Sequence, residues 1–230
     1  MRAISCVFVA VLVVGCSKSS TAPDPAYACA DKPFPTTADT MITVSGTVAD
    51  FLAGALDSVT VRAFKTGSAT AIDSATTDAA GHFSMTVATG GTPLDGYVHA
   101  SKAGYIDTYA YPSAPLPKTA TLSFPMVTTA EFNLLATNAG VTPVAGKASL
   151  GLLPVDCTGT AVTGALVFTS PSAQAYTNGL GDFFVFNATP GSTQVSATFQ
   201  SHIFHAHSVL AIADAVTVTV IAPGPLSPPE

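Results

Sequence analysis

The chain has 230 residues and a formal net charge of −6 at pH 7, and charged side chains make up only 10% of it. An average domain has roughly 25% charged residues, and a mildly acidic chain is poorly suited to bind nucleic acid or anionic lipid headgroups. The 18 glycines and 17 prolines, with many Val and Thr residues between them, favour β-strands separated by turns. We therefore expect an all-β protein with no nucleic-acid partner.

The first element along the chain is a short apolar segment. One positive charge, Arg2, precedes residues 3–14, in which Ser5 is the only polar side chain. Such a segment is too short to span a bilayer but has the length of the apolar part of a secretory signal. It ends in VVGC, which resembles the lipobox of bacterial lipoproteins. The resemblance implies that residues 1–15 are a lipoprotein signal peptide and that Cys16 is acylated; an ordinary secretory signal that happens to contain a cysteine is the alternative.

A fully acylated Cys16 would anchor the chain durably, so the membrane is its first expected partner. Ser17, and not Asp, follows the cysteine, which favours the outer membrane of the bacterial envelope as the location. Residues 16–40 are rich in Ser, Thr, Pro and Ala and show no apolar period. This composition predicts a flexible stalk that lifts the folded part away from the membrane.

Two of the four cysteines remain to be explained once Cys6 is removed with the signal peptide and Cys16 is acylated. In an oxidising compartment, Cys29 and Cys157 are candidates for a disulfide. Such a bond would stabilise the fold by roughly 4–5 kcal/mol in the chain-entropy model, and it would fix the stalk to the second half of the chain. Two unpaired thiols are the alternative.

A short motif occurs twice, as TTDAAGHFSMTV at residues 76–87 and as YTNGLGDFFVFN at residues 176–187. In each copy an Asp or Asn begins a turn, a Gly supplies the positive φ that closes it, and a Phe returns to the core. These residues are Asp78, Gly81 and Phe83 in the first copy and Asn178, Gly181 and Phe183 in the second. The motif predicts a β-hairpin corner, and its recurrence predicts a duplicated domain.

Strands with period-two alternation surround both copies of the motif. In the first half they are expected within residues 41–51, 57–64, 95–111 and 119–127, and in the second within 141–153, 164–170, 193–209 and 215–221. Val144 and Gly146 in the second half are expected at the same places as Val44 and Gly46 in the first, at an offset of one hundred residues.

This order of strands, with T-D-x-x-G-x-F followed by G-Y, resembles the carboxypeptidase regulatory-like domain. The matching residues are Gly46, Asp50, Thr77, Asp78, Gly81, Phe83, Val98, Ala100, Gly104 and Tyr105, then Gly146, Gly164, Ala165, Thr177, Asn178, Gly181, Phe183, Val195 and Ala197. The resemblance implies a prealbumin-like β-sandwich, a fold also grouped with carbohydrate-binding-like folds. We expect two tandem seven-stranded-type sandwiches at residues 41–127 and 141–222, followed by a disordered tail at 223–230. The shared motifs are structural, so they imply a fold more than a function.

The segment between the two halves departs from the β pattern. Thr128 and Glu131 form a capping-box pattern, apolar residues follow at helical spacing, and Gly140 is a suitable stop. We expect a short linker helix within residues 128–140; a loop is the alternative.

Motifs for catalysis are missing from the sequence. None of the five histidines is followed three residues later by Glu, and the only glutamates are Glu131 and Glu230, so the zinc site of a carboxypeptidase has no ligands. The sequence also has no G-x-S-x-G nucleophile turn and no glycine-rich phosphate loop. We therefore expect a protein that is not an enzyme and needs no cofactor.

Two groups of residues are candidates for binding. His205 and His207 lie two apart, which would place both imidazoles on one face of a strand as a weak candidate for a metal pair; the alternative is an edge strand with hydrated imidazoles. Tyr105, Tyr109 and Tyr111 alternate onto one face, and Tyr97 lies on the neighbouring strand. A row of aromatic rings is typical of sugar-binding surfaces. The alternative is that Tyr105 packs into its own sandwich while the others cover an edge.

Phe184 and Phe186 alternate with the inward-facing Phe183 and Val185, so they are expected to point away from the core of their own sandwich. Exposed aromatic side chains on a sandwich are usually covered by something, and we expect the linker helix or the other domain to cover them. The sequence as a whole predicts a non-enzymatic, lipid-anchored structural or binding module of the bacterial envelope, with a glycan or an envelope protein as partner. A carbohydrate-binding module that uses the tyrosine face is the alternative.

Overall fold

The computed structural model describes residues 24–177 and 181–226. The signal peptide, Cys16 and Asn178 lie outside these residues. Within them the chain forms seventeen strands, one α-helix and a short 3-10 helix, so the expected all-β fold is confirmed. In the same part of the chain, no helix is long and apolar enough to cross a membrane.

The first half begins with the 3-10 helix η1 (Pro25–Tyr27) and continues with nine strands. These are β1 (Met41–Asp50), β2 (Gly54–Ala55), β3 (Thr60–Lys65), β4 (Ala71–Thr76), β5 (His82–Ala88), β6 (Gly96–Ser101), β7 (Thr108–Tyr111), β8 (Ala120–Thr121) and β9 (Phe124–Met126).

The second half begins after helix α1 (Thr129–Asn138) and contains eight strands. These are β10 (Ala148–Pro154), β11 (Leu166–Ser170), β12 (Ala175–Thr177), β13 (Phe183–Ala188), β14 (Gly191–Phe199), β15 (His202–Ile203), β16 (His207–Ala211) and β17 (Val216–Ile221).

Each half of the chain buries its own hydrophobic core between two sheets. In the first sandwich, β1 pairs with β5 on one side and with β8 and β9 on the other, and this sheet faces strands β7, β6, β3 and β4. In the second, strands β12, β13, β10 and β17 face a sheet of β11, β14, β15 and β16. Phe83 belongs to the first core and Phe183 to the second. The repeated motif therefore supplies one core phenylalanine to each sandwich.

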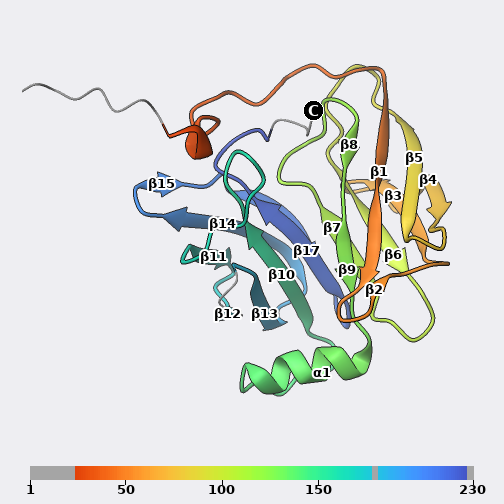
Figure 1. The fold of residues 1–230 in the computed structure, drawn as a ribbon, viewed down its shortest axis with the longest axis vertical. Helices are drawn as coiled ribbons and strands as arrows, with labels where there is room; N and C mark the ends of the chain where they lie inside the picture. Colours follow the sequence, from red (N-terminus) through yellow and green to blue (C-terminus); the bar gives the residue numbers. More distant parts are fainter. Residues whose placement is uncertain (1–23, 178–180, 227–230) are drawn as a thin grey trace, which may run out of the picture.

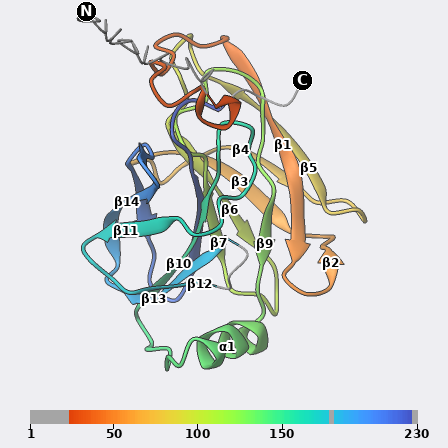
Figure 2. The same ribbon diagram turned by 60° about the vertical axis from the view of Figure 1, so that its left-hand side comes forward.

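The two sandwiches share one continuous sheet, which the sequence analysis did not predict. Strand β17 of the second sandwich pairs in parallel with β7 of the first, from Val216 opposite Thr108 to Thr219 opposite Tyr111. The resulting eight-stranded sheet has the order β12-β13-β10-β17-β7-β6-β3-β4. Figures 1 and 2 show this sheet running through the middle of the molecule, with β1 and β5 on one side and β11 and β14 on the other.

The offset of one hundred residues holds for the motif but not for the strand before it. Gly46 lies opposite Phe83 in the pair of β1 and β5, whereas Leu152 lies opposite Phe183 in the pair of β10 and β13. Gly146 lies in the turn that precedes β10 and has a positive φ of 77°. The expected equivalence of Gly46 and Gly146 is therefore corrected, because the second sandwich uses a strand that begins later in its own segment.

The corner itself also differs between the halves. Asp78 Oδ1 accepts hydrogen bonds from the backbone N–H groups of Ala80 and His82, both at 2.9 Å, and Gly81 has a φ of 77°. This is the expected turn, but β4 pairs with β3 while β5 pairs with β1, so the corner carries the chain from one sheet to the other. In the second sandwich β12 and β13 pair directly as a hairpin.

The linker forms the expected helix. Thr128 caps α1, with its side chain accepting from the backbone N–H of Glu131 and the carboxylate of Glu131 accepting from the backbone N–H of Thr128. This reciprocal pair satisfies two donors that an uncapped helix leaves without partners. Gly140 follows the helix with a φ of 69°, and Figures 1 and 2 show α1 at the end of the molecule opposite η1.

Candidate functional site

The stalk and the C-terminal tail were both expected to be flexible, but the described parts of both, residues 24–40 and 223–226, pack against the sandwiches. Residues 24–40, which we call the N-terminal strap, were expected to be part of a flexible stalk. The backbone N–H groups of Ala38 and Asp39 donate to the carbonyls of Gly91 and Pro117 in the first sandwich, at 3.0 and 2.9 Å. At the other end of the chain, Gly224 is buried and lies so close to the carbonyl of Cys29 that a Cβ at this position would be 2.0 Å from the oxygen. Both segments are therefore part of the folded body.

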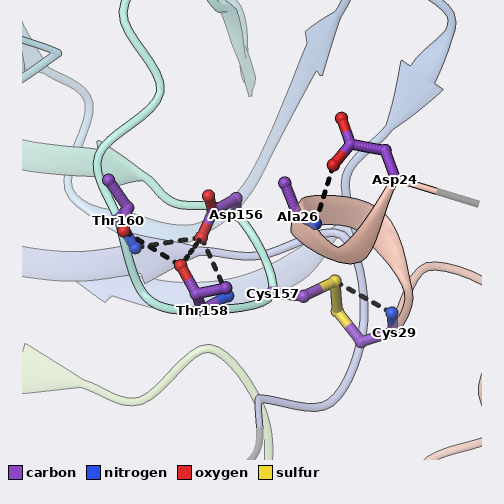
Figure 3. Close-up of a disulfide and its surroundings, with 7 residues drawn as sticks. All are labelled: Asp24, Ala26, Cys29, Asp156, Cys157, Thr158 and Thr160. Atoms are coloured by element: carbon purple, nitrogen blue, oxygen red, sulfur yellow. Dashed lines mark hydrogen bonds between the residues drawn. A yellow bond between two sulfur atoms is a disulfide. The ribbon is translucent and has the colours of Figure 1, made fainter.

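The strap is covalently joined to the second sandwich. Cys29 and Cys157, which the sequence offered as a disulfide pair, are bonded across 128 residues of sequence. The backbone around them is paired as well, because the N–H of Cys157 donates to the carbonyl of Ala26 at 2.8 Å. Figure 3 shows the disulfide between η1 and the loop that follows β10. The bond fixes the beginning of the described chain to the end of a central strand.

The loop that carries Cys157 is held by its own turn. Asp156 Oδ1 accepts from the backbone N–H groups of Thr158 and Thr160 at 2.8 and 3.0 Å, and from the Thr158 hydroxyl at 2.6 Å (Figure 3). Burial on its own raises the pKa of Asp156, but these hydrogen bonds outweigh it and the pKa is lowered overall. The loop therefore presents Cys157 in a fixed position.

Aromatic rings add a second attachment of the strap. Tyr27 stacks on His202 with 3.7 Å between ring centroids and meets Phe204 edge-on at 6.4 Å. Phe34 packs against His205 at 4.3 Å. Burial raises the pKa of Tyr27. The sequence analysis did not single out Tyr27 or Phe34, although two aromatic rings within a segment rich in Ser and Pro were a visible signal of docking.

The four tyrosines expected on one face are divided between the two cores. Tyr105 packs against the first core, and its hydroxyl donates to Asp50 Oδ2 at 2.7 Å. This hydrogen bond is the main reason that the pKa of Tyr105 is raised to about 12 and that of Asp50 is lowered. Tyr97, Tyr109 and Tyr111 instead pack on or within the second core.

Tyr97 is the centre of the aromatic contacts between the sandwiches. Its ring lies 5.0 Å from that of Tyr111 and 5.9 Å from that of Tyr109, and it stacks on Phe64 at 5.3 Å. Tyr111 is only 5% exposed. These rings fill the contact between the sandwiches, so the structure does not bring the four tyrosines onto one open face.

His205 and His207 do not lie on a regular strand together. The chain leaves β15 at Ile203 and enters β16 at His207, so His205 lies in the irregular segment between them. His207 Nε2 is 2.8 Å from Thr219 Oγ1, and that hydroxyl donates to the carbonyl of Tyr111 at 3.1 Å. The tautomer of the His207 ring decides which of the two groups donates in the first bond. His207 thus closes a polar contact between β16, β17 and β7.

Burial lowers the pKa of both histidines, that of His207 to about 4. The two rings are therefore neutral at pH 7. Over residues 24–177 and 181–226, no group of three or more His, Cys, Asp or Glu side chains is placed to hold a metal ion. The histidine pair has structural partners, in the ring of Phe34 and the hydroxyl of Thr219.

Phe184 and Phe186 are covered from within the chain, as expected. The ring of Phe132 on α1 lies 5.5 Å from that of Phe186. Phe51, from the turn after β1 in the first sandwich, meets Phe184 edge-on at 6.2 Å. The linker helix and the first sandwich therefore cover one phenylalanine each, and this packing fixes the relative position of the two sandwiches.

A cavity of about 220 Å³ lies beside this contact. It extends over β7 and β17 of the shared sheet, between β9 of the first sandwich and β10 and β13 of the second, and its lining is mostly apolar. Phe51, Leu122, Gly151, Phe184 and Val218 are among the lining residues. The cavity offers apolar surface from both sandwiches, and the described residues that line it include no His, Lys, Arg or Cys side chain.

A comparison with models of protein families finds no match, and a comparison with curated proteins finds none either. Several solved structures are similar at low identity. A streptococcal ancillary pilin has 14% sequence identity and a TM-score of 0.29 over 80% of this chain and 62% of its own, so this chain spans less than two thirds of that pilin. The shaft pilin SpaA from Lactobacillus rhamnosus GG has 12% identity and a TM-score of 0.25, over 84% of this chain and 100% of its own. The minor pilin of Streptococcus agalactiae has 11% identity and a TM-score of 0.25, over 82% of this chain and 100% of its own. With such low scores, the likeness carries no argument about function.

Proposed function

We propose that this protein is a non-enzymatic structural module of the bacterial envelope, anchored to the membrane by a lipid on Cys16. The observation that supports this most is the disulfide between Cys29 and Cys157, because such bonds form and persist in exported proteins and not in a reducing cytosol. The position of the disulfide also suits a tether, because Cys29 is the first cysteine after Cys16 and its disulfide joins the strap to the second sandwich.

The shared sheet gives the anchor a mechanical connection to the whole molecule. A pull on Cys16 would pass through the strap to Cys157 in the loop that follows β10, and β10 pairs with β17, which pairs with β7 of the first sandwich. The load would therefore reach both sandwiches through backbone hydrogen bonds. This arrangement suits a rigid spacer or a display platform, and it uses no catalytic group.

Carbohydrate binding is not part of the proposal. The tyrosines that suggested it contribute their rings to packing, with Tyr105 hydrogen-bonded to Asp50 and Tyr97 stacked between Phe64 and Tyr111. A sugar platform needs aromatic faces open to solvent.

The anchor is tested by growing cells that express the full chain with radioactive palmitate, followed by separation of membrane and soluble fractions. We expect the label in the protein and the protein in the membrane fraction. Cys16→Ser is the control; it keeps the rest of the signal peptide and should lose both label and membrane association. Equal labelling of the two proteins, or a soluble wild-type protein without label, would contradict the proposal.

A further inference from the structure

The outer face of the sheet formed by β11, β14, β15 and β16 is unusual for a surface, because it combines exposed apolar side chains with no charge. Leu166 is 64% exposed, Phe168 is 50% exposed and Ile203 is 77% exposed. Between Cys157 and Ala213 the sequence contains no Lys, Arg or Glu and a single Asp, Asp182, which precedes β13 in the other sheet.

The register places these three side chains together. Leu166 on β11 and Ile203 on β15 both pair with Thr198 of β14, so they flank it on the same face. Two strand spacings separate them, which is roughly 10 Å. Phe168 lies two residues further along β11 on that face, opposite Ser196. We call Leu166, Phe168 and Ile203 the apolar face.

The apolar face lies next to the point where the chain leaves for its anchor. Tyr27 of the strap stacks on His202, the residue before Ile203, and Figure 1 shows η1 beside β15. Tyr27 is eleven positions after Cys16 in the sequence, and a fully extended chain of that length spans at most about 40 Å. A lipid on Cys16 would therefore hold Tyr27, which stacks on His202 of β15, within about 40 Å of the bilayer.

We propose that the apolar face rests on the lipid bilayer and so sets the orientation of the anchored protein; this inference rests on the proposed acylation of Cys16. Three apolar side chains bind a membrane only weakly by themselves, but a short tether gives them a high effective concentration at the surface. The absence of charge lets them enter the headgroup region without the cost of burying an ion.

The first sandwich has the opposite character. Its strands β3 and β4 carry charged side chains, such as Arg62 and Asp73. Figure 1 places β4 and β5 on the side of the molecule away from β11 and β14. In the proposed orientation, the first sandwich is held away from the bilayer, and the outer face of β11, β14, β15 and β16, which carries no Lys, Arg, Asp or Glu, lies against it. The bilayer is favoured over a second copy of the chain because the tether reaches this face.

The orientation is tested with the acylated full-length protein, purified from membranes and reconstituted into phosphatidylcholine vesicles. A cysteine is introduced by Ile203→Cys and coupled to an environment-sensitive fluorophore; Cys16 is acylated and Cys29 is bonded to Cys157, so the new thiol is the reactive one. We expect blue-shifted emission and loss of intensity when brominated lipids are included. Leu52→Cys, at a site 67% exposed on the first sandwich, is the matched control and should show neither effect.

Two further variants examine the rest of the face while the fluorophore stays at position 203. Phe168→Ser should reduce the quenching by brominated lipid. Leu210 lies on β16 opposite Ser192 of β14, six residues along β14 from Thr198, which the apolar face flanks. Leu210→Ser should therefore leave the quenching unchanged. Quenching at position 203 equal to that at position 52 would overturn the orientation. A blue shift that appears without vesicles and grows with protein concentration would also overturn it, because a second copy would then be the occupant.

Palmitate incorporation measured on the same preparation separates the two proposals. Labelled protein whose position 203 stays in water refutes only the membrane-facing orientation. Protein without label refutes the anchor, and the inference that rests on it fails as well.

Discussion

Replacing both Cys29 and Cys157 by Ala removes the covalent link between the strap and the second sandwich. The disulfide spans 128 residues of sequence, and in the chain-entropy model a loop of that length removes about 16–17 cal/mol/K from the unfolded chain. At 25 °C this corresponds to about 5 kcal/mol. Because whole domains are stable by about 5–15 kcal/mol, the double variant should lose a large part of its free energy of unfolding.

Urea unfolding followed by far-UV circular dichroism measures this loss, since the chain contains no Trp for fluorescence. We expect a single transition whose midpoint moves to much lower urea in the double variant, because the shared sheet couples the two sandwiches. Reduced wild-type protein should behave in the same way. Tyr27→Ala, which removes the stacking on His202 but keeps the disulfide, should cost only about 1–2 kcal/mol. A double variant within about 1 kcal/mol of the wild type would refute the reasoning, because the link would then not constrain the unfolded chain.

Three further changes test the packing and the pH response, each by urea unfolding. Gly46→Ala should destabilise the fold by about 3 kcal/mol or more, because its Cβ would lie 2.0 Å from the carbonyl oxygen of Leu122 and backbone must move. Thr128→Ala removes the cap of α1 and should cost about 1 kcal/mol. His207 has a pKa of about 4 in the fold against about 6.5 when unfolded, so the unfolded chain binds the proton more readily. The stability that His207 contributes is complete above pH 6.5 and falls by up to about 3 kcal/mol towards pH 4; His207→Gln should remove this part of the pH dependence.

Each of these changes has a matched control. Gly146→Ala should cost only about 1–2 kcal/mol, since the position has open space around it and only its positive φ opposes a side chain. Thr129→Ala, on the exposed residue after the cap, should have little effect. His205→Gln should alter the pH dependence less than His207→Gln, because the ring of His205 is less buried. Equal costs for the two glycines, a neutral Thr128→Ala, or an unchanged slope between pH 4 and 6.5 in His207→Gln would each contradict the structural argument for that residue.

Apart from the disulfide, which followed from counting the cysteines, the features that the sequence analysis identified correctly depend on neighbouring residues. The Asp78 turn, the positive φ of Gly81 and the capping box of Thr128 and Glu131 are all decided within a few residues, so residue types and spacing are enough to predict them. The outward orientation of Phe184 and Phe186 followed from the period of two along a strand. The need to cover them followed from the cost of exposed aromatic surface.

The strap shows where composition misled. Residues 24–40 have the composition of a linker, yet Tyr27 and Phe34 dock on histidines of the second sandwich and Cys29 is bonded to Cys157. Average composition describes what a segment does when it is alone in solvent. A pair of rings and one disulfide suffice to hold it once a complementary surface exists. The tyrosines divide for a similar reason, because Tyr105 packs against the first core and Tyr97, Tyr109 and Tyr111 pack on or within the second.

The sequence by itself determined most of the long strands, their inward faces and local turns such as that of Asp78 and Gly81, since each depends on a repeat of two residues or on the allowed φ of one residue. Only the tertiary structure decided which strand lies beside which. Period two shows which face of β17 is buried but not that its parallel neighbour is β7, more than a hundred residues earlier in the chain. Strand register is also set by packing across the sheet, and local sequence alone leaves it open. For this reason the sequence did not reveal that Leu152, and not Gly146, lies opposite Phe183.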